Sequence, residues 1–355
     1  MKTTQDLHII LGHFIIEKKD YSFRPINQGF INDTFLVMAE ETPLFILQRV
    51  NHIVFENVTG LMKNIGTALD FLQDQVYTRI TLVETAEGST FTKIDENYWR
   101  LMTYIDGTTA YDTTTQAKIA SGAGTIVGKF HQLLEKAPYD EFVDTIPKFH
   151  DLSLRKNQFE SALLTTAEER KNTAEKAIIF AQETLPLLLE FSKRKIPVRI
   201  CHNDTKLNNI LFKKEGNQAL CLIDLDTIMK GYFYYDFGDA VRTIVNTAPE
   251  DEQQFEKITF ENTLFEAFVD GIAGVEPFLT QEEINTLPLG AVFMPFIHGL
   301  RALTDYLMGN VYYKVAYENQ NLDRCLSLFD FSKKALDKVT YMEETVSRKL
   351  TARGK

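Results

Sequence analysis

The side chains best suited to chemistry lie in one short polar stretch between two apolar runs. His202 and Asp204 form a His-x-Asp pair, and Asn209 follows Asp204 after four intervening residues. An apolar strand is expected at residues 219–223, and it ends at an acid, Asp224. An Asn and an Asp at adjacent strand ends can share one magnesium ion, which neutralises phosphate charge. Phosphoryl transfer needs that neutralisation from a protein more than anything else.

The spacing matches the catalytic loop of kinases, in which a His-Arg-Asp triplet precedes an Asn by four residues. Here Asn203 occupies the place of the Arg. A His-x-Asp pair alone carries little information, because Asp and Asn are ordinary turn residues. The combination is far more specific: a strand, the spaced loop, a short hairpin over residues 213–218, and a strand that ends in Asp224 and Asp226. It predicts a phosphotransferase site.

The composition sets limits on the function. The chain has 355 residues, of which 44% are hydrophobic and 25% charged, enough for two modest lobes. The net charge of -11 argues against nucleic-acid or anionic-membrane partners, since both need a basic surface. Three widely spaced cysteines form neither a disulfide framework nor a metal knuckle, which favours a reducing, cytoplasmic setting. The apolar segment 293–300 contains Pro295 and His298, so we expect a buried helix there.

The N-terminal part of the chain predicts a hairpin. Strands are expected at residues 21–26 and 30–37, after a helix over 6–14, and the turn between them contains Gly29. In kinases such a loop lies over the nucleotide phosphates and offers them backbone N–H groups. A hairpin turn also needs a glycine for its own geometry. We interpret Gly29 as a phosphate-binding residue because a catalytic-loop pattern follows downstream.

A third strand is expected at residues 44–50, where kinases carry a phosphate-binding lysine. No Lys is present, and Gln48 and Arg49 occupy the region. Arg49 can supply the same charge through a forked guanidinium, and an Arg on an exposed strand is the alternative interpretation. Glu56, just before a helix expected over 57–72, is a candidate partner for Arg49, although acids are common at helix starts because of the helix dipole.

Three further strands, at residues 79–84, 90–94 and 98–105, complete an antiparallel sheet. The last strand leaves one lobe and enters the next, where backbone groups can meet the edge of a purine. We therefore divide the chain into an N-terminal nucleotide-binding lobe, 1–105, and a helical lobe with the catalytic loop and acceptor site, 106–355. The adenine-binding hinge candidates are Thr103, Tyr104 and Ile105.

The rest of the chain is mostly helical by its apolar periodicity. Asp236 is a natural N-cap for a helix over residues 237–245. The other helices are expected at 115–134, 152–163, 173–193 (with a kink or break at Pro186) and over nearly all of 255–350.

His298 and Arg301 bring polar groups onto an otherwise apolar helix. An Arg on such a face needs an acceptor. The sequence leaves two acceptors open: Asp305, four residues further on, or a substrate.

Several stretches together resemble the aminoglycoside phosphotransferase-like kinases, and most closely the bacterial N-acetylhexosamine 1-kinases among them. The His-x-Asp stretch is specific for the superfamily, and residues 203–209 with 223–229 are specific for the subgroup. The resemblance runs nearly end to end. The matching stretches are 29–35, 45–51, 202–211, 223–229, 236–239, 300–307 and 311–312.

This resemblance implies an α+β, two-lobed protein-kinase-like fold, with an N-terminal antiparallel sheet lobe and a larger helical C-terminal lobe. It implies ATP and Mg2+ as cofactors. The Gln at position 48 fits the subgroup, so the missing Lys does not indicate an inactive enzyme. The implied roles are Asp204 as catalytic base with Lys206 beside it, Asn209 and Asp224 as magnesium ligands, and His202 and Asp236 as structural residues. The implied ATP-binding residues are Gly29, Asn32, Gln48, Arg49, Thr103, Tyr104 and Ile105, and the implied sugar-binding residues are Asp204, Asp226, Arg301 and Tyr312.

The expected activity is transfer of the γ-phosphoryl group of ATP to the anomeric hydroxyl of an N-acetylhexosamine. One departure bears on the acceptor: Phe30 stands where the subgroup has a sugar-contacting His, and Phe neither donates nor accepts a hydrogen bond. The alternatives are another acceptor, such as another sugar, an aminoglycoside or an amino alcohol, and a nucleotide-binding pseudokinase. A protein kinase is disfavoured, because no Asp-Phe-Gly and Ala-Pro-Glu segments follow the loop in the usual arrangement. The sequence leaves the oligomeric state open.

Overall fold

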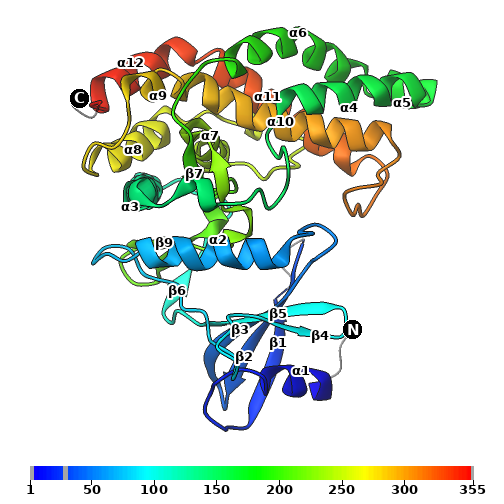
Figure 1. Ribbon diagram of the computed structural model, residues 1–355. Coiled ribbons are helices and arrows are strands. Elements are labelled where there is room, and N and C mark those ends of the chain that lie inside the picture. Colours follow the sequence, from blue (N-terminus) through cyan, green and yellow to red (C-terminus); the bar gives the residue numbers. More distant parts are fainter. Residues whose placement is uncertain (1–3, 27–30, 353–355) are drawn as a thin grey trace.

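The computed structural model describes residues 4–26 and 31–352 and shows two lobes (Figure 1). The smaller lobe contains an antiparallel sheet from the N-terminal part of the chain, and the larger lobe is mostly helical. This arrangement confirms the two-lobed α+β fold predicted from the sequence. Helix α2, Val58–Phe71, lies between the sheet and the helical lobe in Figure 1.

The sheet of the smaller lobe has five antiparallel strands in the order β1-β2-β3-β5-β4. Helix α1, Thr4–Leu11, packs on this sheet, and its Leu7 and Ile10 share a small apolar core with Trp99 and Leu101. The strands are β1 Tyr21–Ile26, β2 Asp33–Ala39, β3 Thr42–Val50, β4 Thr92–Ile94 and β5 Asn97–Thr103.

Helix α2 begins after Asn57, whose side chain accepts a hydrogen bond from the N–H of Gly60 at 2.9 Å, as expected of an N-cap. Its apolar face belongs to the large core of the helical lobe and not to the small core of the sheet. Asn64 on that face donates to the carbonyl groups of Val143 and Ile228 at 2.8 and 2.9 Å. Helix α2 is therefore fixed to the part of the helical lobe that carries the active site.

The strand predicted over residues 79–84 is wrong. Leu82 makes an isolated antiparallel bridge to Met102, and the remaining residues of that segment are irregular. The N–H of Thr78, just before the segment, donates to the carbonyl oxygen of Leu220 in the helical lobe at 2.8 Å. The segment itself is a connection from α2 back to the sheet, where Val83 donates to the carbonyl oxygen of Leu101 at 2.8 Å and Thr81 accepts from the N–H of Thr103 at 3.0 Å.

The helical lobe contains two small sheets beneath its helices. One pairs β7, Arg199–Cys201, with β10, Met229–Gly231, and the other has the order β6-β8-β9. The helix predicted at residues 173–193 is confirmed as α6, and Pro186 lies inside this helix without ending it. The other strands are β6 Thr108–Thr109, β8 Ile210–Lys213 and β9 Ala219–Leu222. The helices are α3 Ala117–Leu133, α4 Leu152–Thr165, α5 Glu168–Thr173, α6 Glu175–Ser192, α7 Phe233–Ile244, α8 Asn262–Ala273, α9 Gln281–Ile284, α10 Leu287–Leu307, α11 Gln320–Leu336 and α12 Val339–Lys349.

Helix α10 runs through the centre of the helical lobe. By length and composition it could cross a membrane, but 83% of its most apolar window is buried inside the protein, as expected for a core helix. It crosses α7 closely: a Cβ atom on Gly238 would lie 2.1 Å from the carbonyl oxygen of Gly290. This contact fixes α7 and α10 against each other, and these two helices carry Asp239 and His298.

Candidate active site

Asp236 fixes the backbone of the catalytic loop through hydrogen bonds. The Asp236 carboxylate accepts hydrogen bonds from the backbone N–H groups of His202, at 2.8 Å, and Asn203, at 2.7 Å. The prediction that Asp236 caps a helix over residues 237–245 is wrong, because α7 begins at Phe233 and Asp236 lies inside its first turn. The geometry nevertheless gives Asp236 the bracing position that the family resemblance implies.

Asn203 reverses the backbone immediately before the catalytic residue. Its φ of 62° lies in the left-handed region, which Asn tolerates better than most residues. Its Nδ2 donates to the carbonyl groups of Cys201 and Thr227 at 3.1 and 3.0 Å. His202 is held on the other side, where its Nε2 lies 2.8 Å from the carbonyl oxygen of Ile223. Both residues keep the loop rigid and set the direction of the next side chain.

Asp204, Lys206 and Asn209 form the chemical centre. The Nζ of Lys206 and the Nδ2 of Asn209 both lie 2.9 Å from Oδ2 of Asp204. The other oxygen of Asp204, Oδ1, makes no hydrogen bond to any described residue, and the side chain is 25% exposed, so a substrate hydroxyl can reach it. Burial lowers the pKa of Lys206, but the carboxylates of Asp204 and Asp224 outweigh that effect and raise it. Lys206 is therefore a cation at neutral pH.

Asp224 stands beside Asn209 because β8 and β9 are paired, and the N–H of Ile223 donates to the carbonyl oxygen of Asn209 at 2.8 Å. Reduced hydration and the nearby carboxylates of Asp226 and Asp204 raise the pKa of Asp224 to about 6. Within the described chain the Asp224 side chain makes no hydrogen bond or ion pair. A cation would relieve the repulsion between these carboxylates, and the side-chain oxygen of Asn209 accepts no hydrogen bond from any described residue. Asn209 and Asp224 therefore fit the oxygen-ligand chemistry of Mg2+.

The sheet lobe reaches the catalytic centre through Arg100 on β5. Its Nη1 lies 2.5 Å from Oδ1 of Asp226, and the two side chains are 2% and 3% exposed. Gln48 holds the guanidinium, because its Oε1 accepts hydrogen bonds from Nε and Nη2 of Arg100 at 3.0 and 2.8 Å. Asn32 donates to Oδ2 of Asp226 at 2.6 Å and accepts from the N–H of Asn51 at 3.0 Å. Asp226 was predicted to contact the substrate. Both of its carboxylate oxygens are instead paired with protein groups, Arg100 and Asn32.

Arg49 lies on the opposite face of β3 from Gln48, since successive side chains of a strand alternate. Its Nε donates to Oδ2 of Asp33 at 2.7 Å, and its Nη1 donates to the side chain of Asn97 at 3.1 Å. The prediction that Glu56 pairs with Arg49 is therefore wrong. Gln48 faces the catalytic side and holds Arg100, its partner on β5. Arg100 therefore supplies the positive charge of the sheet lobe on the side where Arg49 was predicted.

The predicted hinge joins β5 to the helical lobe. The N–H groups of Thr103 and Tyr104 donate to carbonyl groups of the sheet lobe at 3.0 and 2.9 Å. The N–H of Ile105 makes no hydrogen bond within the described part of the chain, so it is the donor that the hinge can offer to a purine nitrogen. Gly29, the predicted phosphate-binding glycine, lies outside the described residues.

Comparison with known families decides where this site belongs. The model of the phosphotransferase enzyme family matches residues 22–268, which include the sheet lobe, the catalytic loop and Asp224. The chain belongs to the phosphotransferase enzyme family. The match accounts for the His-x-Asp stretch and for the paired strands that bring Asn209 and Asp224 together.

Solved structures of this phosphotransferase fold cover nearly the whole chain. A microcompartment-associated aminopropanol kinase is 17% identical with a TM-score of 0.63, and the match covers 96% of this chain and 99% of that one. A spectinomycin phosphotransferase solved with ADP and spectinomycin is 13% identical with a TM-score of 0.59, over 97% and 99% of the two chains. An amicoumacin kinase solved with AMP-PNP and Ca2+ is 14% identical with a TM-score of 0.60, over 94% and 93%. At these identities the likeness shows the fold.

On the predicted acceptor side of this phosphotransferase, the guanidinium of Arg301 lies 5.0 Å from the ring centroid of Phe149. Arg301 has no carboxylate partner among the described residues. Asp305, one of its two predicted partners, instead accepts hydrogen bonds from the N–H groups of Tyr312 and Tyr313 at 2.7 and 3.0 Å. Asp305 thus holds the loop that carries Tyr312, which stays 61% exposed.

The sequence analysis missed Arg100, His150 and Asp239 as residues of the site. A signal for Arg100 was present, because an Arg between apolar neighbours in a buried strand needs a buried acceptor. His150 carries no such signal, and Asp239 lies in the stretch 236–239 that matches the family but had no role implied for it. Their role depends on contacts between segments that are far apart in the chain.

Proposed function

We propose that this phosphotransferase transfers the γ-phosphoryl group of ATP to the C1 hydroxyl of an N-acetylhexosamine, either N-acetylglucosamine or N-acetylgalactosamine. The supporting observation is the charge of the acceptor side. Arg301 has no carboxylate partner in the described chain, whereas Asp305 and Asp239 are both engaged by protein donors. A free guanidinium disfavours an amine and favours a neutral acceptor rich in oxygen atoms.

The sequence pattern supports the same acceptor. Residues 203–209 and 223–229 resemble the N-acetylhexosamine 1-kinases, and so does a Gln at position 48. The structures with this fold come from enzymes named for aminopropanol, spectinomycin and amicoumacin. Amino alcohols are cations at neutral pH, so Arg301, which has no carboxylate partner among the described residues, disfavours such acceptors.

In the proposed reaction, Oδ1 of Asp204 accepts a hydrogen bond from the C1 hydroxyl and takes its proton as the phosphoryl group arrives. A hemiacetal hydroxyl is more acidic than an ordinary alcohol, so a carboxylate is a suitable base. Lys206 offsets charge next to Asp204. Asn209 and Asp224 would hold Mg2+, which neutralises phosphate charge when bound. Because the transition state is loose, positioning by these residues contributes more than proton removal.

The test is to incubate the purified protein with ATP, Mg2+ and a panel of acceptors and to identify the products by phosphorus NMR. The panel contains N-acetylglucosamine, N-acetylgalactosamine, their 1-O-methyl glycosides, aminopropanol and spectinomycin. The proposal predicts an anomeric phosphate from the two free sugars and none from the methyl glycosides, in which C1 is blocked. Phosphorylation of the glycosides, or of an amine acceptor alone, would overturn it. ATP binding without any product would indicate a pseudokinase.

A further inference from the structure

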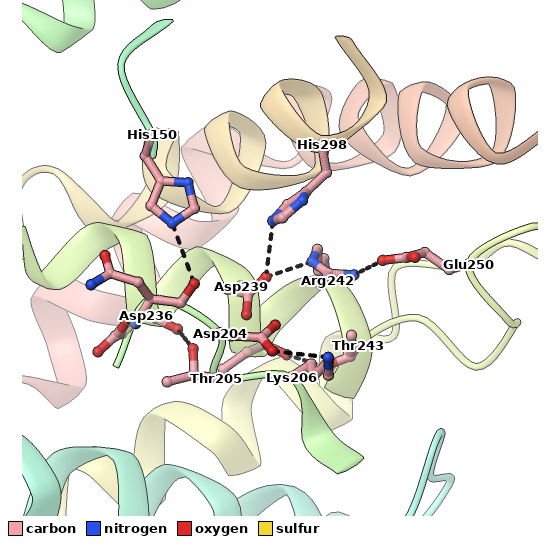
Figure 2. Close-up of polar contacts among 12 residues, drawn as sticks. His150, Asp204, Thr205, Lys206, Asp236, Asp239, Arg242, Thr243, Glu250 and His298 are labelled. Carbon is pink, nitrogen blue, oxygen red and sulfur yellow. Dashed lines mark hydrogen bonds and ion pairs between the residues drawn. The ribbon is translucent and has the colours of Figure 1, made fainter. Parts of the chain in front are cut away.

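Three buried polar side chains gather beside the catalytic loop, each from a different segment (Figure 2). His150 precedes α4, Asp239 lies on α7, and His298 lies on α10. The residues are 4%, 0% and 9% exposed, and the two imidazole rings are 6.0 Å apart between centroids. Figure 2 shows Asp239 between His298 and the pair formed by Asp204 and Lys206.

Asp239 fixes the tautomer of His298. Its Oδ1 accepts a hydrogen bond from Nε of Arg242 at 2.7 Å and lies 3.4 Å from Nε2 of His298. A carboxylate oxygen accepts only, so the Nε2 that faces it carries the proton. In a neutral ring Nδ1 is then a hydrogen-bond acceptor. Nδ1 of His298 makes no hydrogen bond within the described chain, and the side chain keeps 10% exposure.

The tautomer of His150 is also set by a neighbouring acceptor. Its Nε2 lies 3.3 Å from the carbonyl oxygen of Asn203, the residue before Asp204, so Nε2 is the donor and Nδ1 the acceptor. That Nδ1 is buried without a partner, and so is Oδ2 of Asp239. Burial is the main cause of a lowered pKa in both His150 and His298, and the nearby Arg301 lowers both further. Both rings are therefore neutral at neutral pH.

Nε2 of His298 approaches Asp239 at 3.4 Å without hydrogen-bond geometry, and the other unpartnered atoms of this cluster are hydrogen-bond acceptors. Buried acceptors without a partner are costly, so whatever fills the space beside them supplies donors. Hydroxyl and amide N–H groups are neutral donors that suit two neutral imidazole nitrogens, while Arg242, paired with Asp239, and the nearby Arg301 offset the attraction of the Asp239 carboxylate for an ammonium group. The described chain provides no such donor.

We propose that His298, with its tautomer set by Asp239, accepts a hydrogen bond from a second hydroxyl or amide N–H of the acceptor and orients that molecule on Asp204. His150 supports the same arrangement from the side of the catalytic loop. This inference rests on the proposed function, because it assumes an acceptor with several neutral donors. It makes His298 a specificity-determining residue and Asp239 a positioning residue.

The test compares two substitutions that separate the two ring nitrogens. The amide of Gln at position 298 overlays Nε2 and can still donate to Asp239, whereas the amide oxygen of Asn overlays Nδ1 and can still accept from the substrate. We expect His298→Gln to lose about tenfold in kcat/KM for the acceptor, with the KM for ATP unchanged. His298→Asn should stay within about threefold of the wild-type value. Thermal unfolding of both variants checks that they fold.

The opposite order would overturn the inference: a fully active Gln variant and an impaired Asn variant would show that His298 only holds Asp239. Sugars deoxygenated at C3, C4 or C6 give a second readout. With the wild-type enzyme, one of these deoxy sugars should have a kcat/KM about tenfold below that of the parent sugar. With His298→Gln, the same deoxy sugar and the parent sugar should have equal kcat/KM values. If the wild-type enzyme phosphorylates no N-acetylhexosamine, the proposed function fails. The Gln and Asn variants are then compared on the acceptor that it does phosphorylate, and the same order is expected.

Discussion

Arg100 and Asp226 form a buried ion pair between the two lobes, with Nη1 and Oδ1 2.5 Å apart. Arg100 lies on β5 of the sheet lobe, and Asp226 follows the candidate metal ligand Asp224 by two residues. Gln48 and Asn32 complete this contact from the sheet lobe. The position of the sheet lobe is thereby coupled to the position of Asp224, the candidate metal ligand.

Replacing Arg100 by Met removes the counter-ion of a buried carboxylate. Loss of one member of a buried pair costs about 3–5 kcal/mol of unfolding free energy, and we expect that loss in urea denaturation. Arg49→Met is the matched control, because its pair with Asp33 is 34% and 53% exposed. That variant should stay within about 1 kcal/mol of the wild-type protein. Equal losses in the two variants would show that the buried Arg100 pair stabilises the protein no more than an exposed pair does.

The packing of α3 on α8 depends on glycine at the crossing. A Cβ on Gly124 would lie 2.0 Å from the carbonyl oxygen of Phe268, a backbone atom that cannot move aside on its own. Gly124→Ala should destabilise the protein by about 3 kcal/mol, at the upper end of overpacking costs. Gly66 lies in the interior of α2 with open space around it. Gly66→Ala should therefore stabilise the protein by about 1 kcal/mol, and calorimetry of both variants tests the contrast.

Glu250 gives a pH-dependent contribution to stability. It pairs with Arg242 and with Arg324, whose Nη2 lies 2.7 Å away, and these guanidinium groups outweigh its burial and hold its pKa well below the usual value near 4.5. A carboxyl with a lowered folded-state pKa stabilises the protein above its unfolded pKa and loses that contribution as the pH falls below it. The difference in unfolding free energy between the wild-type protein and Glu250→Gln should therefore shrink between pH 5 and about pH 3. A difference that stays constant over this range would contradict the assignment.

The catalytic loop was predictable because its parts are close together in the sequence. His202, Asp204 and Asn209 lie within one loop, and Asp224 follows on the next strand, so spacing alone brought them together. The strands and helices followed from local apolar patterns. The prediction for the segment 79–84 failed because its backbone makes only isolated contacts with β5 and the residue just before it bonds to the helical lobe, which no local pattern reveals.

The lobe contacts could not be predicted from local patterns. Whether Gln48 or Arg49 points toward the catalytic centre depends on which face of β3 each side chain occupies. A shift of one residue in the strand reverses the two faces. Arg100 and Asp226 are more than a hundred residues apart in the sequence, as are His150 and His298. The start of α7 at Phe233 was equally hidden, because the helix begins with three aromatic residues and has no side-chain cap, whereas Asp236 is a common capping residue.

The most direct test of the central claim is the turnover of Asp204→Asn, measured together with its affinity for ATP. Asn keeps the shape and the contacts of the side chain but cannot take a proton. We predict a fall in kcat of about a thousandfold or more, with an unchanged dissociation constant for ATP. Turnover within about tenfold of the wild-type value would contradict the role of Asp204 and the mechanism built on it.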